Sequence, residues 1–269
     1  MKHNVMNEKD LQRIKELRLM DDDFFSEALD GKVEAVEYIL NTILERADIK
    51  VKSTKAQVEY KSATKRSITL DIQAEDADGK LVDIEIQRSD KGAGVRRARY
   101  HSSMIDRTLL SKGEDFEDLV DTYVIFITEN DKYGKGIPLY HVERKITELN
   151  DELFGDGAHI LYVNGEYRNM EHPVGSLMHD FNCKDAKDMV NPLLAEEVRY
   201  LKETEGGQKQ MCRLLEEMRE EAAAEARAEG KASDAIKMLV KGYSIEEIME
   251  ITDLPLEEVQ ELAQGLKQR

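Results

Sequence analysis

The stretch that decides the fold runs from residue 68 to residue 87 and reads ITLDIQAEDADGKLVDIEIQ. Apolar and polar residues alternate over 68–74 and again over 81–87, which is typical of β-strands with two different faces. Between these segments, Asp78-Gly79 is a strong turn signal. The stretch therefore predicts a β-hairpin.

The length of the hairpin loop follows from the two faces. A two-residue loop would place Asp71 opposite Ile86 and mix polar with apolar side chains. A three-residue loop over 77–79 instead places Asp71 opposite Glu85. It also aligns three apolar pairs, which are Leu70 with Ile86, Ile72 with Ile84, and Ala74 with Val82. Because the hydrophobic pattern sets strand register, we predict the longer loop, with Gly79 in the left-handed conformation.

One face of this hairpin carries Asp71, Glu85 and Gln87. Mg²⁺ prefers carboxylate oxygens and retains bound water, and it can activate that water for phosphodiester hydrolysis. Two adjacent carboxylates repel each other unless a cation lies between them. A half-exposed hairpin with a solvated polar face would show the same alternation. The hairpin alone fits both a metal site and a solvated face.

Other elements are predicted around the hairpin. Helical spacing over 10–43, divided at Gly31, precedes a strand within 49–60. A helix is expected from Arg96 to Ser111 with Gly113 as its stop, then strands at 122–128 and 159–163. The chain is expected to be helical again from about 176, with an interruption at Asn191-Pro192. This order predicts an α/β fold with a mixed central sheet flanked by helices.

A boundary is predicted near Gly206-Gly207, which divides the chain into 1–205 and a helical C-terminal appendage, 206–269. Residues 211–230 predict a long Ala/Glu-rich helix, interpreted as a solvated spacer, with a coiled coil as the alternative. A helix–turn–helix pattern follows, with a capping box at Ser244 and Glu247. Its eight acidic residues against four basic ones over 233–269 favour an interaction or dimerisation module over a reader of DNA.

Composition limits the class of protein. Hydrophobic residues make up 41% and charged residues 35% of the 269 residues, and no apolar run reaches membrane-spanning length. Two cysteines and the absence of an apolar N-terminal segment predict a soluble cytoplasmic protein. The six histidines show no HxxxH spacing, so a zinc site is not expected, and His159 and His179 are interpreted as structural.

Charge is distributed unevenly along the chain. The formal net charge is −17, yet residues 55–112 hold twelve Lys and Arg against nine Asp and Glu. Local basicity steers polyanions, so the overall negative charge does not exclude DNA as a partner. The candidate DNA-binding residues follow the hairpin directly: Arg88, Lys91, Arg96 and Arg99.

The motifs together resemble a known family. The hairpin with Asp71 and Glu85-x-Gln87 is similar to the PD-(D/E)XK nuclease fold of the Rpn family of recombination-promoting nucleases, a family of transposases. The resemblance continues in order through most of the chain. It is carried by MDDDFF at 20–25, RARYHSS at 97–103, KGEDF at 112–116, YVIFITE at 123–129, DGAHILYVNG at 156–165 and GYSIEEI at 242–248.

This resemblance implies a site and a reaction. Asp71 and Glu85 would bind Mg²⁺ or another divalent cation, and Gln87 would orient water or phosphate where the wider superfamily has Lys. Gln brings no positive charge, so the metal and nearby bases such as Arg97 would carry more of the charge stabilisation. The implied activity is a Mg²⁺-dependent DNA endonuclease that promotes recombination by cutting.

Three accessory residues remain open. Asp22 resembles an acidic position of the family, but its sequence position favours a helix cap. Arg97 and Tyr100 lie three apart on a predicted helix, where they would contact DNA or brace Glu85. Two other functions are also compatible with the sequence. One is a non-catalytic DNA-binding relative, and the other is an interaction protein that forms a homo-oligomer through its C-terminal helices.

Overall fold

The computed structural model describes residues 7–60, 68–87 and 92–267. The chain divides into two compact units, one ending at Met211 and the other beginning at Cys212. The division falls within one long helix, α7 (Glu205–Val240). The two units are described separately.

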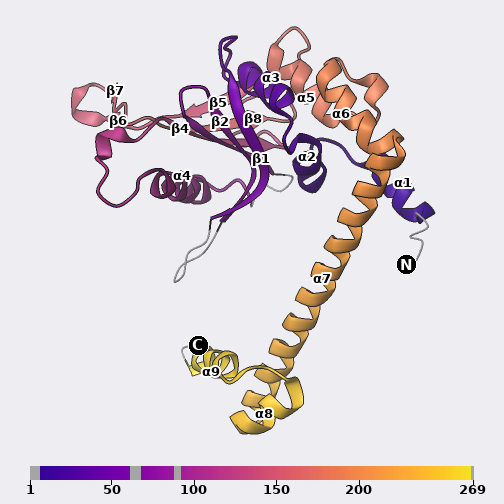
Figure 1. The fold of residues 1–269 in the computed structure, drawn as a ribbon. Coiled ribbons are helices and arrows are strands. Elements are labelled where there is room, and N and C mark those ends of the chain that lie inside the picture. Colours follow the sequence, from indigo (N-terminus) through magenta and orange to yellow (C-terminus); the bar gives the residue numbers. More distant parts are fainter. Residues whose placement is uncertain (1–6, 61–67, 88–91, 268–269) are drawn as a thin grey trace. The chain divides into compact units, whose positions relative to one another are not determined.

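The first unit is built on a mixed six-stranded sheet in the order β1-β2-β3-β4-β8-β5 (Figure 1). Its strands are β1 (Val51–Tyr60), β2 (Ile68–Asp76), β3 (Leu81–Gln87), β4 (Thr122–Thr128), β8 (Ala158–Asn164) and β5 (Leu139–Val142). The β3-β4 and β4-β8 pairs are parallel and the others antiparallel. A separate two-stranded sheet pairs β6 (Lys145–Ile146) with β7 (Glu152–Leu153).

Helices flank this sheet, as the sequence predicted. The first unit contains α1 (Glu8–Glu16), α2 (Asp22–Leu29), α3 (Val33–Ile43), α4 (Val95–Leu109), α5 (Pro173–Asn182) and α6 (Pro192–Glu203). Short 3₁₀ turns lie at Phe116–Asp118, Thr147–Leu149 and Ala186–Asp188. Helix α4 packs on one face of the sheet, where Ala98 and Met104 meet Phe126 and Tyr162. Helix α3 lies on the other side of the sheet (Figure 1).

The central hairpin has the predicted register. Ile72 pairs with Ile84 and Ala74 with Val82. The loop contains three residues, because the backbone N–H of Asp76 donates to the carbonyl of Lys80 at 3.0 Å. Gly79 has φ +83°, the left-handed conformation that glycine adopts at little cost. The solvated-face interpretation is wrong, because every residue of β3 except Gln87 is buried.

Several predicted ends are confirmed and some elements were missed. Strand β4 has the predicted bounds, and α6 begins with Pro192 after Asn191, whose side chain accepts hydrogen bonds from the next two free N–H groups. Strands β5, β6 and β7 were not predicted. They contain four, two and two residues, too few for a period of two to stand out from loop sequence.

The second unit is helical and has a small core of its own. After α7 come α8 (Ile245–Thr252) and α9 (Leu256–Lys267). Four side chains form the buried cluster, from Ala235, Ile248, Leu254 and Val259. The predicted capping box is present, since the Ser244 hydroxyl accepts from the Glu247 N–H and the Glu247 carboxylate accepts from the Ser244 N–H. No helix in the described ranges is long and apolar enough to cross a membrane.

The glycine pair that marked the predicted boundary lies inside helix α7. This helix begins at Glu205 and continues to Val240, beyond both ends of the predicted 211–230. A Cβ at Gly207 would lie 2.1 Å from the carbonyl oxygen of Tyr200. Gly207 therefore permits close packing of the start of α7 against the end of α6, rather than a loose linker.

Candidate active site

Asp71 and Glu85 face each other where the two strands of the hairpin part. The backbone ladder between β2 and β3 ends at Ile72 and Ile84. Beyond it, the N–H of Asp71 donates to Oε1 of Glu85 at 3.2 Å, and the N–H of Ile86 donates to Oδ2 of Asp71 at 2.9 Å. Each carboxylate thus accepts a backbone hydrogen bond from the opposite strand. The predicted pair is brought together and held by the backbone itself.

A third carboxylate and a histidine complete the buried cluster. Asp83 and Glu85 are 0% exposed, and Asp71 is 8% exposed. Helix α4 contributes His101, whose Nδ1 lies 3.1 Å from Oδ2 of Asp83 and 3.7 Å from Oε1 of Glu85. His101 also contacts the ring of Phe126 on the neighbouring strand.

Burial changes the acidity of these groups. The pKa of Asp71 is raised first by loss of solvent and then by repulsion from Glu85. The pKa of Glu85 is raised by burial and then by Asp83, while His101 and Arg97 oppose the shift. Burial also raises the pKa of Asp83 well above its usual range. Without a compensating cation, these raised pKa values favour the protonated forms of the carboxylates.

Arg97 provides the nearest fixed positive charge. Its Nη2 donates to Oε2 of Glu85 at 3.0 Å, and its Nε donates to Nε2 of His101 at 3.2 Å. The side chain is nevertheless 42% exposed. Arg97 therefore braces Glu85, one of its two predicted roles, while part of its guanidinium group faces solvent.

Asp22 interacts electrostatically with the cluster. The N-cap of α2 is Asp21 and makes no capping hydrogen bond, so the interpretation of Asp22 as the helix cap is wrong. Asp22 keeps exposed surface, but packing around its carboxylate raises its pKa and Arg97 opposes this shift. Repulsion from Asp22 contributes in turn to the raised pKa of Asp71. Asp22 thus belongs to the electrostatic environment of the site.

The structure also describes the predicted residues Gln87, Tyr100, Arg96 and Arg99. Gln87 is partly exposed at the end of β3, on the Glu85 face by strand alternation, and pairs with Thr128. Tyr100 packs against the apolar cluster under α4. Arg96 and Arg99 are exposed on α4. Arg88 and Lys91 lie outside the described residues.

Sequence analysis missed Asp83 and His101 as members of the site. Asp83 shares the alternating face of Glu85, and His101 lies one helical turn after Arg97. These spacings were the available signals. Neither spacing shows that Asp83 and His101 are buried, because their burial depends on how α4 packs against the sheet.

The cluster fits a divalent cation. Ligand atoms of Asp83, Glu85 and His101 all lie within 4.8 Å of one another. Oδ1 of Asp83 is buried and has no hydrogen-bond partner in the described structure. Such an atom is costly unless a proton or cation satisfies it. Carboxylate oxygens are the ligands that Mg²⁺ and Mn²⁺ prefer.

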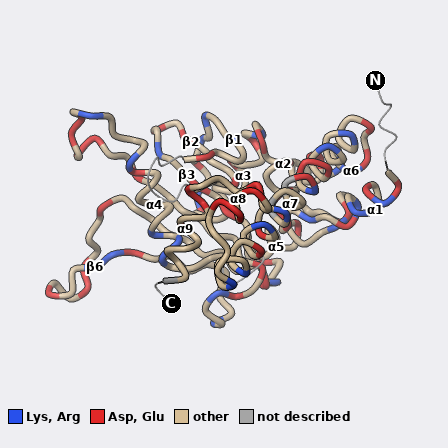
Figure 2. Tube along the Cα trace, turned by 90° about the horizontal axis from the view of Figure 1, so that it is seen from below, with Lys and Arg blue, Asp and Glu red and all other residues tan. Residues whose placement is uncertain are grey.

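The surroundings combine both signs of charge. Figure 2 shows acidic and basic residues interspersed along the chain. The acidic net charge is thus compatible with local basic surfaces, such as the arginines at the start of α4.

Comparisons with known proteins address the family. A family model described as PD-(D/E)XK nuclease family transposase matches residues 23–235. The match includes the hairpin, α4 and most of α7, whereas α8 and α9 lie beyond it. Searches of curated proteins and of solved structures gave no match. The family match spans most of the chain and agrees with the mixed sheet and its acidic hairpin, and the chain therefore belongs to the PD-(D/E)XK nuclease family transposases.

Proposed function

We propose that the protein is a Mg²⁺-dependent DNA endonuclease that hydrolyses phosphodiester bonds and promotes recombination through the breaks it makes. The observation that carries this proposal is the buried cluster of Asp71, Asp83 and Glu85 at the point where the hairpin strands part. Burying three carboxylates is unfavourable, and raised pKa values express that cost. A divalent cation offsets it and is the cofactor that hydrolysis of DNA needs.

The proposed metal ligands are Asp71 and Glu85, as the family resemblance implied. Asp83 is proposed as a third ligand because its carboxylate is buried beside them. A divalent ion bound there would activate water and neutralise charge on the phosphate. The backbone N–H groups of Asp71 and Ile86 fix the orientation of the two facing carboxylates. Asp22 adds negative charge near Asp71 and would strengthen cation binding.

Arg97 and Gln87 are proposed to act on the phosphate side. Arg97 supplies the positive charge that Gln87 lacks, and its exposed part is available to a phosphate oxygen. Gln87 would orient water or phosphate through its amide, from the same face as Glu85. Tyr100, a residue of α4 that packs against the apolar cluster under this helix, is proposed as a support for Arg97 rather than as a direct contact.

The DNA backbone is proposed to lie along the start of α4. Arg96 and Arg99 are exposed there, directly after the hairpin. Arg88 and Lys91, which lie outside the described residues, are proposed as DNA contacts from the sequence. Such contacts neutralise phosphates and position the duplex without reading its sequence.

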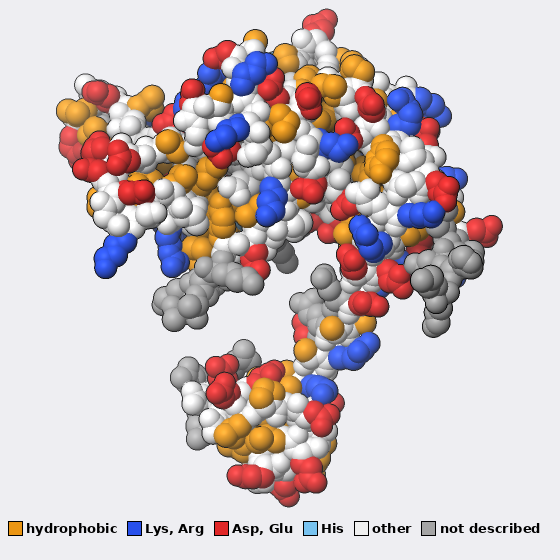
Figure 3. All heavy atoms as spheres, viewed as in Figure 1, with side chains coloured by type: hydrophobic (Ala, Val, Ile, Leu, Met, Phe, Trp, Pro, Cys, Tyr) orange, Lys and Arg blue, Asp and Glu red, His pale blue; other side chains and the backbone are white. Residues whose placement is uncertain are grey.

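The C-terminal unit is proposed to mediate self-association rather than DNA binding. Its surface shows hydrophobic side chains bordered by acidic ones (Figure 3). Exposed apolar residues there include Val240 at 72% and Ile251 at 64%. No disulfide joins Cys183 or Cys212 among the described residues, which is consistent with a reducing compartment, so the cytoplasm is the proposed location.

The proposal is tested by nicking of supercoiled plasmid with Mg²⁺ or with EDTA. Glu85→Gln removes a buried site carboxylate, while Glu75→Gln is the matched control on the same hairpin, where Glu75 pairs with Lys52 away from the site. Nicking that requires Mg²⁺, is lost in Glu85→Gln and is retained in Glu75→Gln supports the enzyme. Metal-independent DNA binding without nicking would instead support a non-catalytic relative.

A further inference from the structure

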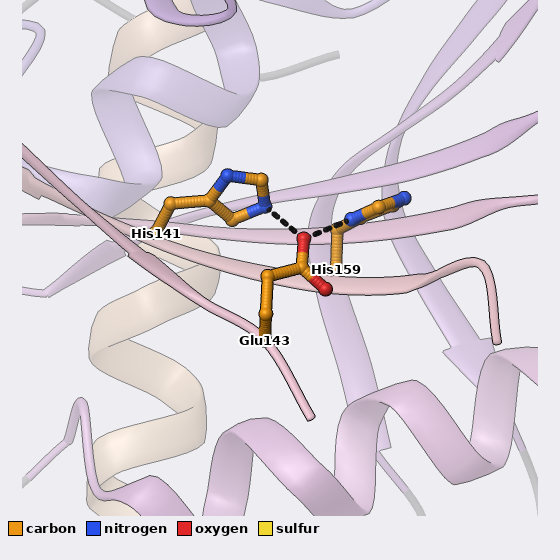
Figure 4. Close-up of side chains that lie close together, drawn as sticks. All are labelled: His141, Glu143 and His159. Carbon is orange, nitrogen blue, oxygen red and sulfur yellow. Dashed lines mark hydrogen bonds and ion pairs between the residues drawn. The ribbon is translucent and has the colours of Figure 1, made fainter. Parts of the chain in front are cut away.

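A second cluster of metal-ligating side chains lies away from the nuclease centre. It consists of His141 on β5, Glu143 just beyond that strand, and His159 on β8 (Figure 4). Oε1 of Glu143 lies 2.7 Å from Nε2 of His141 and 2.7 Å from Nδ1 of His159. The two imidazole rings, from two strands, thus converge on one carboxylate oxygen.

Strand register explains why these residues meet. His141 pairs with Leu161 in the antiparallel β5-β8 ladder, so continuing the register places Glu143 opposite His159. His141 and Glu143 are two residues apart and share a face of the sheet. Backbone pairing therefore brings these three residues together, although their sequence spacing matches no HxxxH pattern.

The cluster and the nuclease centre lie on opposite faces of the sheet. Glu85 is level with Phe126 and Tyr162 across β4 and β8, and these rings pack under α4. His159 lies three residues before Tyr162, so its side chain points to the other face. The two sites are therefore physically separate.

The cluster has the features of a metal site with an open position. Side chains of Glu143 and His159 are 21% and 22% exposed, and His141 is 45% exposed. Tyr123 stacks on the His159 ring with centroids 4.6 Å apart, which fixes the orientation of that ring. Both histidines line a cavity of about 320 Å³. A fourth ligand, such as water or a small solute, has room there.

We propose that His141, Glu143 and His159 bind a divalent transition-metal ion, with Zn²⁺ as the best match. Two imidazoles and one carboxylate with a vacant fourth position are a donor set that suits zinc and iron. Mg²⁺ prefers a shell of oxygen ligands and binds such a set poorly. The proposal revises the sequence-based expectation that no zinc site is present and that His159 is structural.

The test is Zn²⁺ binding by the full chain after removal of metal with a chelator, measured by competition with a chromophoric chelator near neutral pH. The site variants are His141→Ala and Glu143→Gln. Glu85→Gln reports on the nuclease centre. His172→Asn is the matched control, because it removes another imidazole that faces a carboxylate and retains a side-chain acceptor at the start of α5.

The expected result is loss of one zinc equivalent in both site variants and no loss in Glu85→Gln or His172→Asn, with excess Mg²⁺ present throughout. Co²⁺ bound at this site should give the visible absorption bands that are typical of a Co²⁺ ion with a low coordination number. These bands should be absent from the site variants. Equal unfolding temperatures in chelator show that the variants fold. Unchanged zinc stoichiometry in the site variants, or loss of zinc only in Glu85→Gln, overturns the proposal.

Discussion

At the scale of single residues, the candidate active site is defined by buried carboxylates. Burial removes their hydrating water, and the protein supplies too few hydrogen-bond donors to replace it. Glu85 accepts from the Asp71 N–H and from Arg97, and Asp71 accepts from the Ile86 N–H. Oδ1 of Asp83 has no partner among the described residues. The hydrogen bonds orient the carboxylates but leave their charges largely uncompensated, which is the condition in which a cation binds well.

The stability of the metal-free protein should therefore fall as pH rises. The folded-state pKa values of Asp71 and Glu85 are each raised to about 8, above the value of roughly 4 expected for unfolded chains. Between these limits the folded state holds more protons than the unfolded state, so ionisation on raising the pH opposes folding. In EDTA, the urea midpoint should be lower at about pH 8.5 than at about pH 5.5.

Mg²⁺ should reverse this trend, because a bound cation takes the place of the protons. The stabilisation by Mg²⁺ should be larger at the higher pH and should diminish in Glu85→Gln. A urea midpoint that rises with pH in EDTA, or that Mg²⁺ leaves unchanged at the higher pH, would contradict the assignment of these carboxylates as ligands.

At the scale of elements, the hairpin could be predicted and the packing of α4 could not. The alternation of apolar and polar residues over 68–87 shows which side chains lie on each face of the hairpin. Only one loop length keeps the polar residues on one face and the apolar residues on the other, so the position of Asp71 opposite Glu85 follows from the sequence. Asp83 and His101 meet only because α4 packs on the sheet. No local pattern contains that information, and the polar face was equally compatible with solvent.

The same limit applies to β5. Its four residues are too few to show a period, and their role depends on pairing with β8, a strand that lies later in the sequence. The contact of His141 and His159 with Glu143 was consequently out of reach of spacing arguments, which detect ligands on one helix or one loop.

Helix α4 should also set the salt dependence of DNA binding. Replacing Arg96 and Arg99 with Gln removes two exposed positive charges directly after the hairpin. The slope of log affinity against log salt should become less steep by about 2, since each lost phosphate contact contributes about 0.9. Fluorescence anisotropy with labelled DNA in EDTA measures the slope. Arg107→Gln, in the last turn of the same helix, is the control.

An unchanged slope in the double variant would show that the start of α4 does not contact the DNA backbone. An equal change in Arg107→Gln would show that overall charge, rather than the start of the helix, governs binding. Either result would leave the assignment of the buried carboxylates as metal ligands intact, because neither Arg96 nor Arg99 contacts them in the described structure.

At the scale of the whole molecule, the site residues and the C-terminal core belong to different units. Ile248 is fully buried in the second unit, whereas Ile251 on the same helix is 64% exposed. Ile248→Ala should destabilise that unit by about 2–5 kcal/mol, and Ile251→Ala should change its stability little. Hydrogen exchange should accelerate in α8 and α9 of the first variant only.

DNA nicking by Ile248→Ala should remain at the wild-type level, because Asp71, Asp83 and Glu85 lie in the first unit. A fall in nicking with Ile248→Ala would show that the C-terminal unit takes part in activity. A fall with Ile251→Ala as well would indicate that activity depends on the self-association proposed for its exposed apolar residues.

The most direct test of the central claim is the rate of Mg²⁺-dependent plasmid nicking by Asp71→Asn beside Asp78→Asn. Both changes replace one carboxylate with an amide in the same hairpin, but Asp71 is buried at the site and Asp78 is exposed at the turn. Loss of a metal ligand removes several kcal/mol of transition-state stabilisation, on the order of 100-fold or more in rate. We predict that loss for Asp71→Asn and a wild-type rate for Asp78→Asn. Equal rates for the two variants would contradict the account.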